Sequence, residues 1–136
     1  MVEKSVYVLL VNPHEEYLLL KAADGKEEWS LPGGHPEGSE NDIQALSREL
    51  FEECKIKDFQ LAKNFVEEDR FINQKGIERL QIIYLARTKN TNVILSNEHT
   101  KFGWFKFGEV ITKMRHDSWK GILRRADKIL RSSSSK

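Results

Sequence analysis

The sequence predicts an α/β (α+β) fold, a sandwich in which helices pack on a mixed β-sheet. Three observations predict it: unbroken apolar runs near the start, an amphipathic segment in the middle of the chain, and a second amphipathic segment close to its end. The 136 residues, 39% of them hydrophobic and 32% charged, are enough for one domain with its own core. We expect a single domain over residues 1–131 and a disordered serine-rich tail over 132–136.

The strands are predicted from apolar runs that lie between turn-forming residues. Val6–Val11 and Tyr17–Leu20 flank an Asn-Pro-His-Glu-Glu stretch, which indicates a β-hairpin. Runs without polar alternation are typical of strands buried on both faces, as in a sheet between two layers of helices. Further strands are expected at 59–67, 80–87, 92–95 and 104–107.

Two helices are predicted from apolar residues at helical spacing. The first follows the Pro- and Gly-rich stretch 32–38, with Ser39 as its N-cap and Asp42 completing a capping box. The second is capped by Asp117 and ends before the serine tail. The apolar stripe of the first helix is formed by Ile43, Leu46, Leu50 and Cys54, and that of the second by Trp119, Ile122, Leu123, Ala126, Ile129 and Leu130.

Charge and composition exclude several classes of protein. The formal net charge is +1, so there is no overall attraction to nucleic acid or to a membrane surface. No stretch approaches the roughly 20 apolar residues of a membrane-spanning helix. The single cysteine, Cys54, cannot form an internal disulfide, and a cytoplasmic location is expected. The four histidines show no metal-ligand spacing and are expected on the surface.

The first helix carries a cluster of acidic side chains. At 100° per residue, Glu49, Glu52 and Glu53 lie within an arc of roughly 100° that borders the apolar face. Like charges at this spacing repel by about 3 kcal/mol per pair at an effective dielectric constant near 20. Protons or a multivalent cation relieve such repulsion, and clustered carboxylate oxygens suit Mg²⁺. A solvated acidic helix face is the alternative.

The spacing around this cluster resembles the Nudix box. Gly34, five residues, Glu40, seven residues, Arg48-Glu49-Leu50-x-Glu52-Glu53 and then Ile56 reproduce that pattern over residues 34–56. One position departs from it, because Lys55 stands where the family has glycine. If the helix ends there on a left-handed residue, lysine costs roughly 1–2 kcal/mol. The resemblance implies a Nudix-type α/β/α sandwich and Mg²⁺-dependent hydrolysis of a pyrophosphate linkage, with Mn²⁺ as a possible substitute.

The resemblance also implies roles for individual residues. The groups expected to hold the metal are the side chains of Glu49, Glu52 and Glu53 and the backbone carbonyl of Gly33. Arg48 and Glu40 are expected to form a structural pair that supports the loop at Gly34. Residues 96–104 resemble the segment in which many family members carry a further glutamate, so Glu98 is a candidate fourth ligand or general base. Glu52 is the competing candidate for the base. The catalytic residues are therefore expected among Glu52, Glu53 and Glu98.

The substrate is expected to be a small nucleotide. A nucleoside triphosphate, oxidised or not, and a dinucleoside polyphosphate are equally favoured. Trp29, Phe71 and Tyr84 are candidates for stacking on a base, with packing in the core or at its rim as the alternative. The rival hypothesis is a non-catalytic Nudix-like domain that binds a nucleotide or an RNA end, favoured by Lys55 and by the basic segment 113–136. A solvated helix surface also explains that segment, so nucleic acid is not the expected partner.

Overall fold

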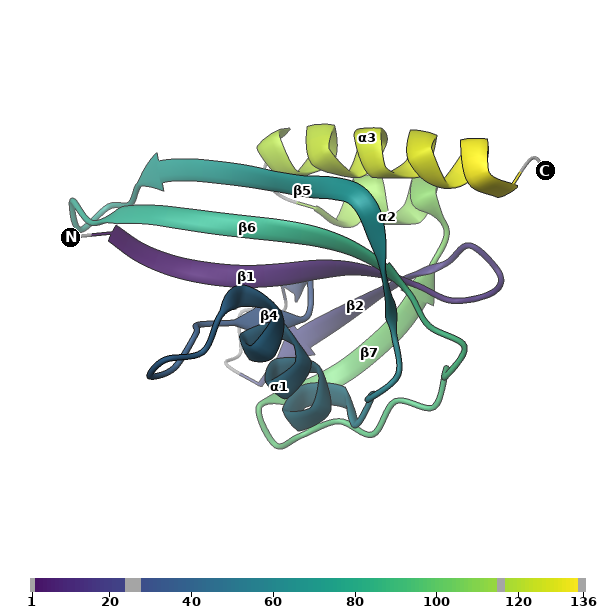
Figure 1. The fold of residues 1–136 in the computed structure, drawn as a ribbon, viewed down its shortest axis with the longest axis horizontal. Coiled ribbons are helices and arrows are strands. Elements are labelled where there is room, and N and C mark those ends of the chain that lie inside the picture. The colour runs from purple at the N-terminus through teal and green to yellow at the C-terminus, as the bar shows by residue number, and fades with distance from the viewer. Residues whose placement is uncertain (1, 24–27, 115–116, 135–136) are drawn as a thin grey trace.

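The computed structural model describes residues 2–23, 28–114 and 117–134, and it shows a mixed sheet between helices (Figure 1). The predicted fold class is therefore confirmed. The strands are β1 Val2–Val11, β2 Tyr17–Ala22, β3 Trp29–Ser30, β4 Gly33–Gly34, β5 Gln60–Ile72, β6 Glu78–Arg87 and β7 His99–Phe105. The helices are α1 Asp42–Cys54, α2 Phe107–Lys113 and α3 Asp117–Ser134.

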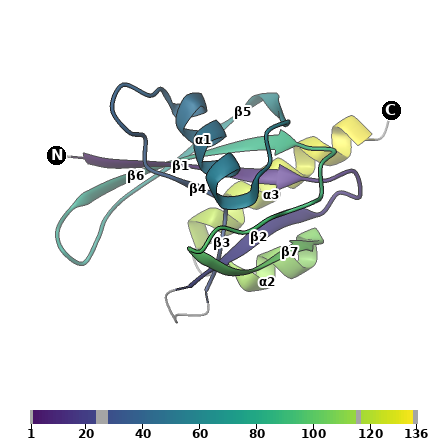
Figure 2. The same cartoon turned by 90° about the horizontal axis from the view of Figure 1, so that it is seen from below.

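The pairing of β1 explains why the short strand β4, which consists of Gly33 and Gly34, can join the sheet. β1 and β6 run parallel along their whole length, from Val2 opposite Glu78 to Val11 opposite Arg87. The predicted hairpin of β1 and β2 is present, but its register is the single pair Val11 and Tyr17. Since β2 diverges from β1 beyond that pair and joins β7, β4 can pair with the middle of β1 (Figure 2). The sheet order is β3-β2-β1-β6-β5.

Helices cover both faces of the sheet, as the unbroken apolar runs predict. Alternate residues of β1 enter different cores: Val6, Val8 and Leu10 pack with α1, and Leu9 and Val11 pack with α3. Figure 1 shows α1 below the sheet and α2 and α3 above it. The predicted stripe residues Leu46, Leu50 and Cys54 of α1 are fully buried, and so are Leu123 and Ala126 of α3.

The start of α1 differs from the sequence prediction. The N-cap is Asn41 and not Ser39, and the capping box is formed with Gln44 and not with Asp42. The Asn41 side chain accepts the Gln44 N–H at 2.8 Å, and the Gln44 side chain accepts the Asn41 N–H at 2.9 Å. Glu40 lies in a turn, because its N–H donates to the Glu37 carbonyl at 3.0 Å and its carboxylate is bound by Arg48. Those contacts keep residues 39–40 outside the helix.

The end of α1 agrees with the prediction. Lys55 is the C-cap in the left-handed region, with φ 61° and ψ 28°, and its N–H donates to the Phe51 carbonyl at 3.0 Å. Its ammonium lies 4.6 Å from the centre of the Phe51 ring, and that of Lys57 lies 5.1 Å from it. These cation–π contacts partly offset the cost of the left-handed backbone.

Other element boundaries differ from the prediction. Residues 92–95 form no strand, and β7 begins at His99 and ends at Phe105, before the short helix α2 that the sequence analysis missed. β5 extends to Ile72, with an irregular register between Leu61 and Val66. α3 continues through Ser134, past the expected helix end at 131, and Asp117 is its first residue.

Residues 115–116 and 135–136 lie outside the described residues. In the described part of the chain, no helix is long and apolar enough to cross a membrane.

Replacing Lys55 by glycine is expected to raise the free energy of unfolding by about 1 kcal/mol, because glycine adopts the left-handed region without steric cost. Urea unfolding of the variant and the wild type measures this difference. Lys57→Ala, which removes only a cation–π contact, is the control and should change stability by less than about 0.5 kcal/mol. A loss of stability in Lys55→Gly would show that the ammonium contact outweighs the backbone strain.

Candidate active site

Two glycines bring the backbone of β4 against α1. Gly33 and Gly34 pair with Tyr7 and Val6 of β1. A side chain on Gly33, whose φ is 152°, would overlap the carbonyl oxygen of Val6. A Cβ on Gly34 would lie 2.5 Å from a carboxylate oxygen of Glu49. Position 33 therefore requires glycine, because the overlap is with backbone, whereas a side chain at position 34 would displace the Glu49 carboxylate.

Arg48 joins the loop to the acidic side chains of α1. Its guanidinium binds both carboxylate oxygens of Glu40, at 2.8 Å and 3.1 Å, which lowers the pKa of Glu40. One amino nitrogen also donates to Glu49 at 2.7 Å and to Glu52 at 2.8 Å. The other amino nitrogen donates to the carbonyl of His35 at 2.9 Å. These hydrogen bonds raise the pKa of Arg48, so the side chain stays charged.

Glu53 is the buried carboxyl group of the cluster, with 7% of the residue exposed. One oxygen accepts the Gly33 N–H at 2.9 Å, and the other lies 3.7 Å from Nε2 of His99. Burial, followed by repulsion from Glu49 and Glu98, raises the pKa of Glu53 to about 8, although the Gly33 hydrogen bond opposes the shift. Without a cation, this group is therefore mostly protonated at neutral pH.

Glu49 and Glu52 lie on the same helix but in different surroundings. The Glu49 side chain is 17% exposed, and burial raises its pKa against the opposing effect of Arg48. The Glu52 side chain is 53% exposed and contacts Arg48 at the solvent edge. The cluster thus extends from a buried end at Glu53 to a solvent-exposed end at Glu52.

Glu98 approaches the same cluster from the turn before β7. Its charge raises the pKa of both Glu49 and Glu53, so the three carboxylates lie within electrostatic reach of one another. The loop that carries it is fixed to the end of α1: Ser96 N–H donates to the Glu53 carbonyl at 3.2 Å and Ile94 N–H to the Cys54 carbonyl at 3.1 Å. Residues distant in sequence therefore meet at one site.

His99 is the site residue that the sequence analysis misjudged. It was expected on the surface, but its side chain is only 9% exposed and faces Glu53. Its Nδ1 is buried without a hydrogen-bond partner in the described part of the chain, and burial lowers the pKa of the ring. The sequence contained one indication of this position. His99 directly follows Glu98 at the start of a strand, where successive side chains point to opposite faces of the sheet.

The donor chemistry of the cluster fits a hard divalent cation. Carboxylates surround Glu53, whose pKa is raised first by burial and then by their repulsion, and a cation would remove that repulsion. In the observed conformation, no three His, Cys, Asp or Glu side chains of the described ranges converge on one point. Arg48, which holds Glu49 and Glu52, accounts for their present orientation. The contact of Gly33 with the cluster is made through its N–H.

The three aromatic candidates for substrate binding do not form one pocket. Trp29 packs on the α3 side of the sheet, edge-to-face with Phe105 at 5.1 Å. Tyr84 packs on the α1 side and donates to Asp42 at 3.3 Å. Phe71 is 40% exposed near the end of the β5–β6 hairpin. Core and edge packing thus explains Trp29 and Tyr84 without a ligand.

The fold and the arginine-held glutamate cluster define a class, the α/β/α hydrolases with an acidic Nudix helix. The NUDIX domain family model matches residues 1–125, and the chain belongs to this family. The predicted family and enzyme class, a Nudix-type pyrophosphohydrolase, are thereby confirmed. Nudix hydrolases generally use divalent metal ions.

The chain is similar to several proteins named bis(5'-nucleosyl)-tetraphosphatase [asymmetrical]. The chain is 32% identical over 122 residues to the bis(5'-nucleosyl)-tetraphosphatase [asymmetrical] of Rattus norvegicus, covering 87% of this chain and 82% of that protein. It is 31% identical over 112 residues to the Caenorhabditis elegans protein of the same name, covering 81% of each. A solved binary complex of a C. elegans Ap4A hydrolase has a TM-score of 0.87 at 25% identity and covers 96% of this chain and 98% of that one. The MutT protein from Methanosarcina mazei Go1, at 24% identity and a TM-score of 0.75 over 93% of this chain and 94% of that one, shows the fold.

Replacing Glu53 by glutamine is expected to stabilise the metal-free protein at pH 8. The folded-state pKa of about 8 lies above the usual value of 4.5, so the wild type loses stability as the pH rises between these values. The variant cannot ionise and keeps an oxygen for the Gly33 N–H. Urea unfolding with a chelator at pH 5 and pH 8 should show a gain of a few kcal/mol at pH 8.

The control for this prediction is Glu68→Gln, which changes an exposed glutamate of β5. It should leave the pH dependence of the wild type unchanged. A Glu53→Gln protein as pH-sensitive as the wild type would show that the buried carboxyl group ionises without cost.

Proposed function

We propose that this protein hydrolyses the polyphosphate bridge of dinucleoside tetraphosphates asymmetrically, releasing a nucleoside triphosphate and a nucleoside monophosphate. The observation that carries the proposal is the cluster of Glu49, Glu53 and Glu98 beside Gly33. The chain also aligns with about four-fifths of the length of relatives that are named for this reaction. The relatives favour dinucleoside polyphosphates over nucleoside triphosphates, which the sequence alone ranked equally.

The proposed ligands of the divalent cation, Mg²⁺ with Mn²⁺ as a substitute, are Glu49, Glu52, Glu53 and Glu98 with the carbonyl of Gly33. When bound, such a cation would offset the repulsion between these carboxylates and the substrate phosphates and would favour negative charge on oxygen. The remaining contributions come from the chain itself. Arg48 orients Glu49 and Glu52, and the Gly33 N–H fixes one oxygen of Glu53.

Glu98 is our choice for the general base that takes the proton of the attacking water. The Glu52 carboxylate accepts hydrogen bonds from the guanidinium of Arg48, which leaves it less free to accept a hydrogen bond from the attacking water. Among the described residues, none donates a hydrogen bond to the Glu98 carboxylate, and its backbone is fixed because its carbonyl accepts the Ala23 N–H at 2.8 Å. Glu98 is therefore held in place with its carboxylate available.

Glu98→Gln is expected to lower kcat at least 100-fold, because a positioned general base contributes roughly 10²- to 10⁴-fold to rate. Glu52→Gln should lower kcat about tenfold, because the bound cation loses one proposed ligand and is less precisely positioned. Initial rates with a dinucleoside tetraphosphate and saturating Mg²⁺ measure both, with Glu68→Gln as the control that retains full activity. Unchanged kcat in Glu98→Gln with a large loss in Glu52→Gln would assign the base to Glu52.

The activity itself is tested with a panel of nucleotides and product analysis. Release of nucleoside monophosphate and triphosphate from a dinucleoside tetraphosphate is expected with Mg²⁺ or Mn²⁺ and not with a chelator, and Glu53→Gln should nearly abolish it. Faster hydrolysis of nucleoside triphosphates, oxidised ones included, would refute the substrate assignment. Nucleotide binding without metal-dependent hydrolysis would favour the non-catalytic alternative.

We further propose small nucleotides, not nucleic acid, as the partners, and a cytoplasmic location. Part of the basic charge of α3 is locally paired, since Arg125 binds Glu67 at 2.8 Å and Arg131 binds Asp127 at 2.8 Å. Cys54, the single cysteine, is buried in the core under α1.

A further inference from the structure

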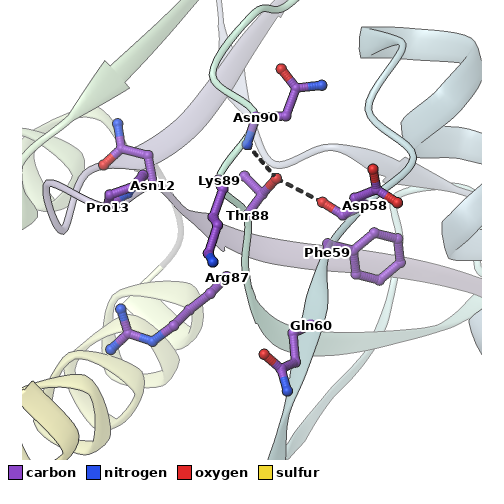
Figure 3. A pocket seen from close by; sticks show the side chains of 9 residues that line it. All are labelled: Asn12, Pro13, Asp58, Phe59, Gln60, Arg87, Thr88, Lys89 and Asn90. Atoms are coloured by element: carbon purple, nitrogen blue, oxygen red, sulfur yellow. Dashed lines mark hydrogen bonds between the residues drawn. The ribbon is translucent and has the colours of Figure 1, made fainter.

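A cavity lies beyond the carboxyl end of β1, away from the glutamate cluster. It is lined by Asn12 and Pro13 of the β1–β2 turn and by residues 58–60 and 87–90, and its volume is about 700 Å³ (Figure 3). Cavities that hold small molecules measure roughly 300–1,000 Å³. Asn12 follows Tyr7, the partner of Gly33, by five residues, which is roughly 17 Å along an extended strand. The cavity is therefore separate from the glutamate cluster.

Hydrogen bonds tie the walls of this cavity together. Thr88 is 4% exposed; its hydroxyl donates to the Asp58 carbonyl at 2.7 Å and accepts the Asn90 N–H at 3.1 Å. Its own N–H donates to the carbonyl of Val11 at 2.9 Å. On the turn, Asn12 is 2% exposed, and its side-chain oxygen accepts the N–H groups of His14 and Glu16. The cavity is thus preformed, and a ligand need not order it.

The lining combines cations, neutral hydrogen-bonding groups and an aromatic ring. Figure 3 shows Arg87, the last residue of β6, and Lys89 in the segment that follows it, with Phe59 across from the Asn12 turn. The Phe59 ring is half-buried, because part of it packs against the core on the α1 side. One amino nitrogen of Arg87 binds Glu15 at 3.0 Å, which leaves its other donors for a ligand. Lys89 is exposed and has no ion-pair partner in the described ranges. Asp58 also lines the cavity and can accept hydrogen bonds from hydroxyl or amino groups.

We propose that this cavity binds a nucleoside monophosphate, with the phosphate at Arg87 and Lys89 and the base against Phe59. Guanidinium and ammonium groups bind phosphate oxygens, and a base stacks on an aromatic ring. The Asp58 carboxylate can accept hydrogen bonds from ribose hydroxyls, and its negative charge disfavours longer polyphosphates. The choice among phosphate-bearing ligands rests on the proposed function, since a nucleoside monophosphate is one of its products.

The test is a titration of the full-length, ¹⁵N-labelled protein with adenosine monophosphate, followed by NMR in the presence of a chelator. Saturable shifts are expected for the amides of residues 58–60 and 87–90. Lys89→Glu should weaken binding at least tenfold, whereas Lys75→Glu, the same charge change in the distant β5–β6 turn, should weaken it less than twofold. Inorganic phosphate and adenosine, each alone, should bind at least tenfold more weakly than the nucleotide.

Four results would overturn the proposal. They are the absence of shifts at millimolar nucleotide, shifts confined to residues 33–34 and 49–53, equal weakening by the two lysine variants, and binding of phosphate as tight as that of the nucleotide. Hydrolysis is measured in parallel and should be retained in Lys89→Glu. A wild type that binds the monophosphate in this cavity but hydrolyses no dinucleotide would refute the proposed function and leave the cavity assignment standing.

Discussion

The structure of the site depends on one guanidinium group. Arg48 binds Glu40 in the turn before α1 and also binds Glu49 and Glu52 on the helix itself. One planar cation thus sets the path of the glycine loop and the orientation of two carboxylates. A lysine could not replace it, because a single ammonium lacks the fork of donors that binds the two oxygens of one carboxylate while reaching other acceptors. The same contacts explain why like charges tolerate close spacing at the solvent-exposed end of the cluster.

Local features of the sequence predicted which side chains of α1 lie together in the candidate site. Spacing along one helix is enough to place Glu49, Glu52 and Glu53 together, because helical geometry is independent of the rest of the fold. The left-handed end at Lys55 was also predictable, since the departure from the family pattern lies at the helix terminus. The apolar runs of β1 and β2 predicted a sheet covered on both faces for the same local reason.

What the sequence did not predict depends on contacts between distant segments. Ser39 and Asn41 are both good N-caps, and the ion pair between Glu40 and Arg48 decides between them. The burial of His99 results from the pairing of β7 with β2, and the cavity at Thr88 results from the meeting of loops far apart in the chain. Helix α2 is too short, at seven residues, to give a clear helical period.

Two hydrogen bonds fix the loop of residues 88–98 to the end of α1. They divide the loop into a part that is bound to the helix, from Ile94 onward, and a part before Ile94 that is not. The N–H groups of Ile94 and Ser96 satisfy carbonyls of Cys54 and Glu53 that a helix terminus leaves open. Residues before Thr91 lie upstream of these two bonds and of the Thr91 carbonyl that accepts the Trp104 indole N–H at 3.4 Å, so a change of length there leaves the contacts with α1 intact. Between Ser96 and Glu98, a single inserted residue would rotate the glutamate away from the helix. Evolutionary change in loop length should therefore be confined to the segment upstream of Thr91.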